Sequence, residues 1–274
     1  MRIARGISIA NASRPISTAA AFDADAVAFF TAANITDTTQ KSAVNTLVLS
    51  LKSANIWNKM KALYPVVGGV ASSHAVNLKQ PGTYNLTFTT GWTHSITGMT
   101  PTAAYAETGL VSQSVFPTTS IHLSTYSRTQ IINNTNFRFE IGAYDGTNFT
   151  GISQQYDNLG KFFGAGINNS SYQIIVPNTV SSAVTTGLQI GNRLSNVMKV
   201  FQNGTELSNK NVTNSSLSTN SFFIGAYKNL SSGYSDYSNR QLAFASIGDG
   251  LTDTDATNFY NAVQNYQTTL GRQV

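Results

Sequence analysis

Cysteine is absent from the 274-residue chain, and charged residues make up only 11% of it. Without cysteine the protein can form neither a disulfide nor a thiolate metal site. Ordinary globular proteins carry about 25% charged residues, so this protein must build its polar surface from Ser, Thr, Asn and Gln. Hydrophobic residues, at 41%, are plentiful enough for a real core, and this composition excludes intrinsic disorder.

Long apolar runs are also missing. No stretch of the sequence approaches the roughly 18 apolar residues of a membrane span. The opening "MRIARGISIANASRP" contains no apolar run of the kind that marks a signal peptide. We therefore expect no membrane partner, and a protein that is made in a cytoplasm and leaves it by a route other than secretion.

Glutamate is scarce, which bears on catalysis. The three glutamates are Glu107, Glu140 and Glu206. Glycan hydrolases need a pair of carboxylates, whereas Glu140 stands alone on its expected strand, so we expect it to pair with Arg138 or Arg128. This argues against a glycan hydrolase, and we predict a protein that is not an enzyme and uses no cofactor.

Metal ligands are equally sparse. The histidines have no ligand spacing and are His74, His94 and His122. The turn sequences "DGTN" with Asp145 and "SDYSNR" with Asp236 could offer oxygens to calcium, but Asx turns explain them more simply. We predict no metal site, although the sequence leaves calcium open.

Positive charge gathers at the N-terminus. Residues 1–22 carry three arginines and no acidic residue, whereas residues 23–274 carry 14 basic and 12 acidic side chains. Three scattered arginines without a basic face argue against nucleic-acid binding. The alternating run "RIARGISIA" can add a strand to a neighbouring chain. We predict that this arm mediates assembly through Arg2, Ile3, Arg5, Ile7 and Arg14; the alternative is a solvated tail, with the sandwich itself making the contacts.

The next segment, residues 23–69, is expected to be a helical module. Asp23 can cap a first helix, and Thr36 or Asp37 a second one, with Asp37 and Gln40 fitting a capping box. In the second helix the apolar residues recur at i, i+3, i+4 and i+7, as on one face of an α-helix, namely at Val44, Leu47, Val48 and Leu51. We expect helix to continue through "IWNKMKALY" until Pro65.

From about residue 70 the hydrophobic period changes from 3.6 to 2, and many short strands with turns between them predict an antiparallel sandwich. Ile-Gly-Ala-Tyr occurs at 141–144 and again at 224–227. Glycine within a strand marks a close approach of another group. We predict that the two copies are corresponding core strands, neighbours in one sheet, with Ile141 and Ile224 buried. Phe139, Ile141 and Ala143 are expected to share one face.

The end of the sequence predicts a hairpin and a terminal helix. Asn203-Gly204 between two strand-like runs is a strong hairpin signal. Thr252 and Asp255 form a capping box. The apolar stripe of the following helix, which we expect to dock on the sandwich, is Phe259, Val263, Tyr266 and Leu270.

Tyrosines in polar, turn-rich surroundings provide candidates for ligand binding. Sugar-binding proteins stack pyranose rings on exposed aromatic side chains, whose rings are apolar and whose hydroxyl is polar. The same tyrosines can instead simply pack. The predicted ligand-binding residues are Tyr126, Tyr144, Tyr156, Tyr234 and Tyr237, to which Tyr172 can be added.

Segments of the sequence resemble those of two groups of known proteins. "KVFQNGTEL", "SFFIGAYKN" and "LTDTDA" resemble the end of concanavalin A-like (laminin-G-like) jelly-roll domains, over roughly residues 80–274. The helical segment before "PVVGG", together with "GWTHSITGMTP" and "YNAVQNYQTTLGRQV", is similar to virion-associated proteins of tailed bacteriophages. This resemblance implies a virion location and a fibre, baseplate element or head decoration, with other virion proteins and its own copies as partners.

These observations together predict a mainly β fold: an antiparallel two-sheet jelly-roll sandwich with an N-terminal helical module and a C-terminal helix. The expected units are a basic arm (1–22), the helical module (23–69) and the sandwich with its helix (70–274). The leading hypothesis is a virion structural protein. One alternative is a carbohydrate-binding receptor domain for a host surface glycan. The other is a glycan hydrolase, against which the scarcity of glutamate argues.

Overall fold

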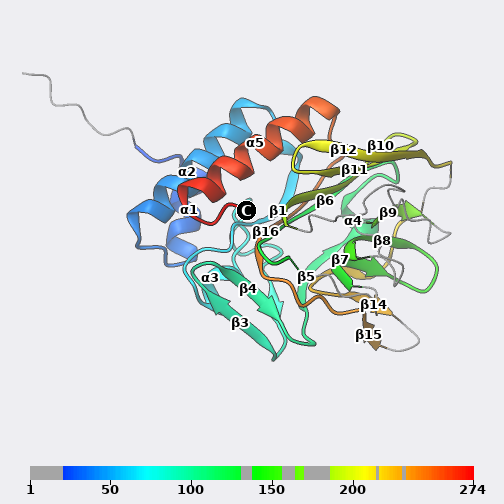
Figure 1. Cartoon of the computed structure of the whole chain (residues 1–274), viewed down its shortest axis with the longest axis horizontal. Helices are drawn as coiled ribbons and strands as arrows, with labels where there is room; N and C mark the ends of the chain where they lie inside the picture. Colours follow the sequence, from blue (N-terminus) through cyan, green and yellow to red (C-terminus); the bar gives the residue numbers. More distant parts are fainter. Residues whose placement is uncertain (1–20, 131–137, 156–163, 170–185, 214–215, 230–232) are drawn as a thin grey trace, which may run out of the picture.

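The computed structural model describes residues 21–130, 138–155, 164–169, 186–213, 216–229 and 233–274. Within them the protein has three layers (Figure 1): helices, a large antiparallel sheet, and a smaller antiparallel sheet. The helices α1, α2 and α5 lie together on one side, and the short strands β14 and β15 lie on the opposite side. The predicted fold, a two-sheet sandwich with N-terminal helices and a C-terminal helix, is confirmed.

The large sheet lies directly beneath the helices. Its strand order is β12-β11-β10-β6-β16-β4-β3, and β1 pairs with β16 as well. Every pairing in it is antiparallel. Its strands are β1 (Met60–Tyr64), β3 (Trp92–Ser95), β4 (Gly98–Pro101), β6 (Ser120–Ser127), β10 (Gly187–Leu194), β11 (Val197–Gln202), β12 (Thr205–Asn211) and β16 (Leu242–Gly248).

The smaller sheet has the order β2-β5-β13-β7-β8-β9, and the β14–β15 hairpin accompanies it. Within this sheet too the strands pair antiparallel. The strands are β2 (Thr87–Phe88), β5 (Ala106–Val111), β7 (Arg138–Tyr144), β8 (Phe149–Gln155), β9 (Gly164–Asn169), β13 (Ser221–Ile224), β14 (Tyr227–Asn229) and β15 (Gly233–Ser235).

Side-chain caps set where the helices begin. Asp23 accepts a hydrogen bond from the backbone of Asp25 at the start of α1, and Asp37 accepts one from Gln40 at the start of α2. Thr252 and Asp255 form the predicted reciprocal capping box of α5. The helices are α1 (Ala24–Ala32), α2 (Thr38–Ser53), the short α3 (Ala71–His74) and α4 (Ser112–Val115), and α5 (Asp253–Thr269).

Two hydrophobic cores separate the layers. One lies between the helices and the large sheet, and it contains the predicted stripes of α2 and α5 together with residues of β6, β10 and β16. The other lies between the two sheets and contains Ile141 and Ile224, both 0% exposed as predicted. Because helical and sheet residues share the first core, the helices are a cover on the sandwich. Whether 23–69 is a separate domain stays a prediction.

The repeated Ile-Gly-Ala-Tyr segments are paired strands, as predicted. Ile224 of β13 lies opposite Ile141 of β7. A Cβ on Gly142 would come within 2.5 Å of the Tyr227 Cβ, so glycine lets β14 cross the sheet there. Gly225 serves another purpose: its φ of +85° bends the chain between β13 and β14, a conformation that other residues rarely adopt.

Two local predictions are wrong. Residues 57–64 do not continue a helix, since a 3-10 turn (Trp57–Lys59) leads into β1, which pairs with β16. Phe139 does not share a face with Ile141: irregular register between β7 and β8 turns Phe139 out of the inter-sheet core into a separate aromatic cluster with Phe149 and Tyr227. Long-range strand pairing overrides the helical pattern in the first case.

The predicted assembly residues of the arm, Arg2, Ile3, Arg5, Ile7 and Arg14, lie outside the described residues. Their role stays a prediction. Among the described helices, none combines the length and apolar character needed to cross a membrane.

Candidate functional site

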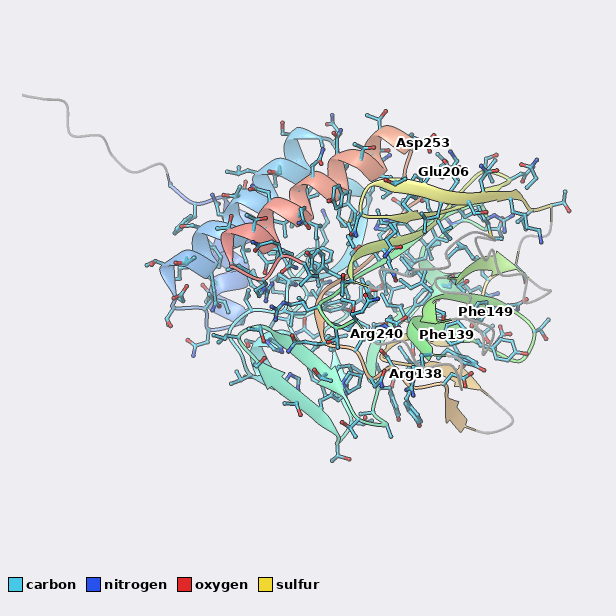
Figure 2. The ribbon with its side chains drawn as sticks, in the orientation of Figure 1. Arg138, Phe139, Phe149, Glu206, Arg240 and Asp253 are labelled. Atoms are coloured by element: carbon cyan, nitrogen blue, oxygen red, sulfur yellow. The ribbon has the colours of Figure 1, made fainter. Side chains whose placement is uncertain are left out.

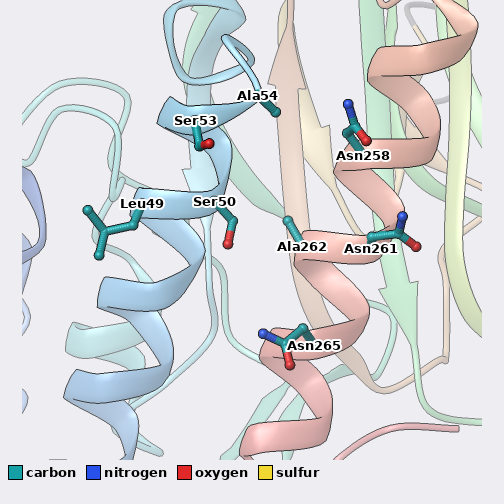
Figure 3. A pocket seen from close by; sticks show the side chains of 8 residues that line it. All are labelled: Leu49, Ser50, Ser53, Ala54, Asn258, Asn261, Ala262 and Asn265. Atoms are coloured by element: carbon teal, nitrogen blue, oxygen red, sulfur yellow. The ribbon is translucent and has the colours of Figure 1, made fainter.

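Two surface hollows in the described part of the chain are large enough to hold a small ligand. One is a groove of about 620 Å³ between α2 and α5 (Figure 3), lined by Leu49, Ser50, Ser53, Ala54, Asn258, Asn261, Ala262 and Asn265. The other, the Tyr237 pocket, has a volume of about 510 Å³ and is lined by Thr100, Pro101, Thr102, Ala103, Arg138, Asp236, Tyr237, Ser238 and Asn239. The groove offers small and amide side chains, whereas the Tyr237 pocket combines an aromatic ring, a carboxylate and a guanidinium.

Three distant parts of the chain build the Tyr237 pocket. The first wall follows β4, where the Thr102 amide donates to the Gly91 carbonyl at 2.8 Å. The second wall is the segment 236–239, in which Asp236 has a φ of +54° and turns the chain. This segment is tied to the start of β7, because the Phe139 amide donates to the Asp236 carbonyl at 3.0 Å and Phe139 bridges Tyr237.

Arg138 is the first residue of β7 and is bonded to the second wall. Its Nη1 donates to the Tyr237 carbonyl oxygen at 3.0 Å. Among the described residues its Nε is buried without a hydrogen-bond partner, and so is Oδ1 of Asn239 in the same lining. Buried polar atoms almost always have a partner in the protein or in ordered water. Both atoms are inaccessible to solvent, so they lie behind the surface of the pocket.

Asp236 adds a carboxyl group to this lining. Burial raises the pKa of Asp236 above its ordinary value, although a hydrogen bond from the Tyr227 side chain and the charge of Arg138 act in the opposite direction. The carboxyl is half-buried. It is therefore a polar group held in place by its neighbours, suited to receiving a hydrogen bond from a ligand.

A buried ion pair supports the second wall from behind. Glu140 and Arg240 are both 0% exposed, with 3.9 Å between Oε1 and Nη1. The Ser238 hydroxyl donates to Glu140 Oε1 at 3.0 Å and accepts from the Arg240 amide at 3.2 Å. Figure 2 places Arg138, Phe139 and Arg240 together, far from Glu206 and Asp253 on the helix side. The predicted partners of Glu140, Arg138 and Arg128, are wrong, since its ion pair is with Arg240.

The predicted tyrosines are dispersed. Tyr237 lines the pocket. Tyr144 is at the other end of β7, about 20 Å from Arg138 at the usual rise per residue, packed on Phe149 and Tyr227. Tyr126 is 0% exposed beneath α5, where its hydroxyl donates to Gln264. The expectation of an exposed Tyr126 ring is therefore wrong, because that side of β6 faces the helices.

The remaining candidates fall partly beyond what the structure describes. Tyr156 and Tyr172 lie outside the described residues, and of Tyr234 only the backbone, in β15, is described. Sequence reasoning missed Arg138 and Asn239 as site residues. Their neighbourhood depends on a pairing between β7 and residues about 100 positions later, for which no local signal exists.

The two sites considered for calcium differ in detail. Asp145 accepts hydrogen bonds from the Thr147 and Asn148 amides, which form the Asx turn that the sequence indicates. It also accepts one from the Thr219 amide, which is distant in the sequence. Asp236 belongs to the Tyr237 pocket. In the described part of the chain, no group of three or more His, Asp or Glu side chains could hold a metal ion.

Two histidines that are distant in sequence meet in the structure. Nδ1 of His74 lies 2.9 Å from Nδ1 of His94, beside the rings of Trp92 and Phe88. Burial, together with the charges of His94 and Arg272, lowers the pKa of His74 to about 3. Burial also lowers the pKa of His94. The pair is therefore a neutral hydrogen-bonded contact between α3 and β3, and the spacing of the two residues in the sequence offers no sign of it.

Comparison with known proteins supports the fold. No family model matches the chain, and no curated protein matches it. Its fold is similar to that of the binding domain of Paraclostridial Mosquitocidal Protein 1, with 12% identity, a TM-score of 0.50, and coverage of 75% of this chain and 52% of that one. It is also similar to botulinum neurotoxin type C, which depends on interaction with two ganglioside molecules to enter cells (11% identity, TM-score 0.51, 77% and 53% coverage).

A third solved structure is domain 4 of the extracellular arabinanase AbnA from Geobacillus stearothermophilus, in complex with arabinotriose (16% identity, TM-score 0.45, 73% and 98% coverage). The chain spans about half the length of the two toxin structures. At these identities the likeness to the two toxin structures shows a shared β-sandwich fold and no more. The resemblance to phage virion proteins stays a prediction.

Proposed function

We propose that this protein is a carbohydrate-binding β-sandwich domain that recognises a surface glycan in the Tyr237 pocket. The observation that carries the proposal is the chemistry of the pocket lining. The lining combines the Tyr237 aromatic side chain and the Asp236 carboxyl group with the guanidinium of Arg138 and the amide of Asn239. Sugar rings present an apolar face and a rim of hydroxyls, which both donate and accept hydrogen bonds.

The position of the pocket supports a display role. It lies on the side of the small sheet, and the helices cover the opposite face of the large sheet. A pocket of this volume is within the range of small-molecule sites. The fold is also shared with a toxin that interacts with ganglioside molecules. Attachment through the helical side would leave the pocket free for a glycan.

We further propose that binding proceeds without catalysis. Hydrolysis of a glycosidic bond needs two carboxyl groups that flank it. Asp236 lines the pocket, whereas Glu140 is 0% exposed and committed to Arg240 and Ser238. This arrangement supports a binding role over a hydrolytic one.

The test is a glycan-array screen of the full chain, followed by calorimetric titration of the glycans that bind. Tyr237→Ala should weaken binding by about 2 kcal/mol, roughly thirty-fold in Kd, as truncation of an aromatic anchor does. Asn239→Ala should weaken it as well. Tyr260→Ala, on α5 at the opposite side of the large sheet, is the matched control and should bind normally. Failure to bind any glycan, or normal binding by Tyr237→Ala, would overturn the proposal.

A further inference from the structure

The outer face of β5 begins beside the Tyr237 pocket. The chain runs from the pocket-lining residues Thr102 and Ala103 to Tyr105, which precedes β5. The Ala104 carbonyl closely approaches Gly225, whose own carbonyl accepts a hydrogen bond from the Ser238 amide. The loop before β5 and the second pocket wall therefore flank the same residue, Gly225.

Tyr105 is a fixed, half-buried ring. It packs edge-on against Phe223, with ring centroids 5.3 Å apart. Its backbone is held by Thr89, whose amide and hydroxyl both donate to the Tyr105 carbonyl. Phe223 is only 1% exposed, so the Tyr105 ring covers it from the outside. A ring held in this way loses little conformational freedom when a ligand stacks on it.

Beyond Tyr105 the outer face of β5 is open and polar. Burial alternates along the strand, so that Glu107 and Gly109 are exposed while Ala106, Thr108 and Leu110 point inward. The Ser221 hydroxyl donates to Glu107 Oε1 at 2.7 Å and holds the carboxylate in place. A Cβ on Gly109 would have no heavy atom of the described residues within 4 Å. We call this surface, from Tyr105 through Glu107 to Gly109, the β5 shelf.

We propose that the β5 shelf extends the Tyr237 pocket into one continuous site that takes a neutral oligosaccharide rather than a single terminal sugar. The inference rests on the proposed carbohydrate binding. Tyr105 is then a second stacking ring, and Glu107 accepts hydrogen bonds from sugar hydroxyls. A carboxylate on the shelf repels acidic sugar units, which selects neutral ones. The shelf and the pocket together therefore select for chain length and for charge.

The experiment uses the full chain and a series of neutral gluco-, xylo-, galacto- and manno-oligosaccharides of one to six units, measured by calorimetry. Affinity should increase at least tenfold between the single sugar and the oligosaccharide of the preferred series. Tyr105→Ala should lose about tenfold in affinity for the oligosaccharide and keep its affinity for the single sugar. Tyr105→Phe, which keeps the ring packed on Phe223, should retain most of the affinity, whereas Tyr237→Ala should weaken both ligands.

Charge selection is tested by comparing lactose with sialyllactose on the full chain and on Glu107→Gln. The wild type should bind lactose more tightly than sialyllactose. Glu107→Gln should reduce this difference in affinity. Three results would each overturn the proposed shelf site and leave the proposed pocket site intact. They are equal affinity for short and long ligands, equal losses of affinity for both in Tyr105→Ala, and an unchanged charge preference in Glu107→Gln. Absence of binding to every sugar tested would overturn the carbohydrate-binding proposal itself.

Discussion

Removing one partner of the buried Glu140–Arg240 pair should cost a substantial part of the protein's stability. Two unit charges 3.9 Å apart attract by about 4 kcal/mol at an effective dielectric constant of about 20. Removing one partner of a buried pair leaves an uncompensated charge and costs about 3–5 kcal/mol. Since domains are stable by only about 5–15 kcal/mol, Arg240→Met or Glu140→Gln alone should remove a fifth or more of the free energy of unfolding.

The double variant measures the interaction between the two charged side chains apart from their interactions with the surroundings. Glu140→Gln with Arg240→Met removes both charges of the pair, so it should be more stable than the sum of the single losses predicts, by at least about 2 kcal/mol of coupling. Urea unfolding followed by tryptophan fluorescence measures each free energy. Lys61→Met is the control, because it breaks a single, partly exposed pair with Asp249 and should cost less than about 1 kcal/mol.

Two results would refute this reasoning. One is a loss below about 1 kcal/mol in Arg240→Met, the same as in the Lys61→Met control. The other is strict additivity of the two single losses in the double variant. Because Ser238 connects Glu140 to the pocket wall, the single variants should also weaken glycan binding. The double variant should weaken it as well, since the amide that replaces the Glu140 carboxylate lacks the charge that orients the Ser238 hydroxyl.

Two further predictions concern the core and the histidine pair. Ile224→Asp should abolish soluble expression, because Ile224 is 0% exposed between the sheets and an unpaired buried charge costs several kcal/mol; Ile96→Asp, at a residue 69% exposed, should express normally, and a folded Ile224→Asp protein would contradict the core assignment. The lowered pKa of His74, about 3 against 6.5, means that the unfolded chain binds a proton more readily than the folded one, so stability is complete above about pH 6.5 and decreases as the pH falls towards 3. Urea midpoints measured from pH 7 to pH 4 should decline less steeply for His74→Leu than for the wild type, and identical slopes would show that the pair does not control this loss.

Features with a local physical cause could be predicted from the sequence. The caps at Asp23, Asp37 and Thr252 depend on residues within three positions of one another. Asn203-Gly204 both take positive φ in the predicted hairpin. The pairing of Ile141 with Ile224 was predictable for a different reason, because the repeated segment showed that two distant strands occupy like environments.

The candidate site depends on contacts that no local pattern encodes. Arg138 meets Tyr237 because irregular register at the start of β7 exposes that end of the strand to the segment after β15. His74 and His94 meet because α3 packs on β3. Tyr126 was misassigned for a related reason: on β6 both faces are buried, one by the other sheet and one by α5, so alternation alone cannot tell an exposed tyrosine from a covered one.

The central position of β16 has a consequence for biosynthesis. This strand lies between β6 on one side and β1 and β4 on the other, yet all three precede it in the chain. A ribosome therefore exposes β1, β4 and β6 long before their shared partner emerges. Until then these strands present unpaired edges, which are templates for pairing with other chains. Nascent chains that stall before residue 242 should thus be the aggregation-prone species, and expression at a reduced temperature or with a chaperone that holds extended segments should raise the yield of folded protein.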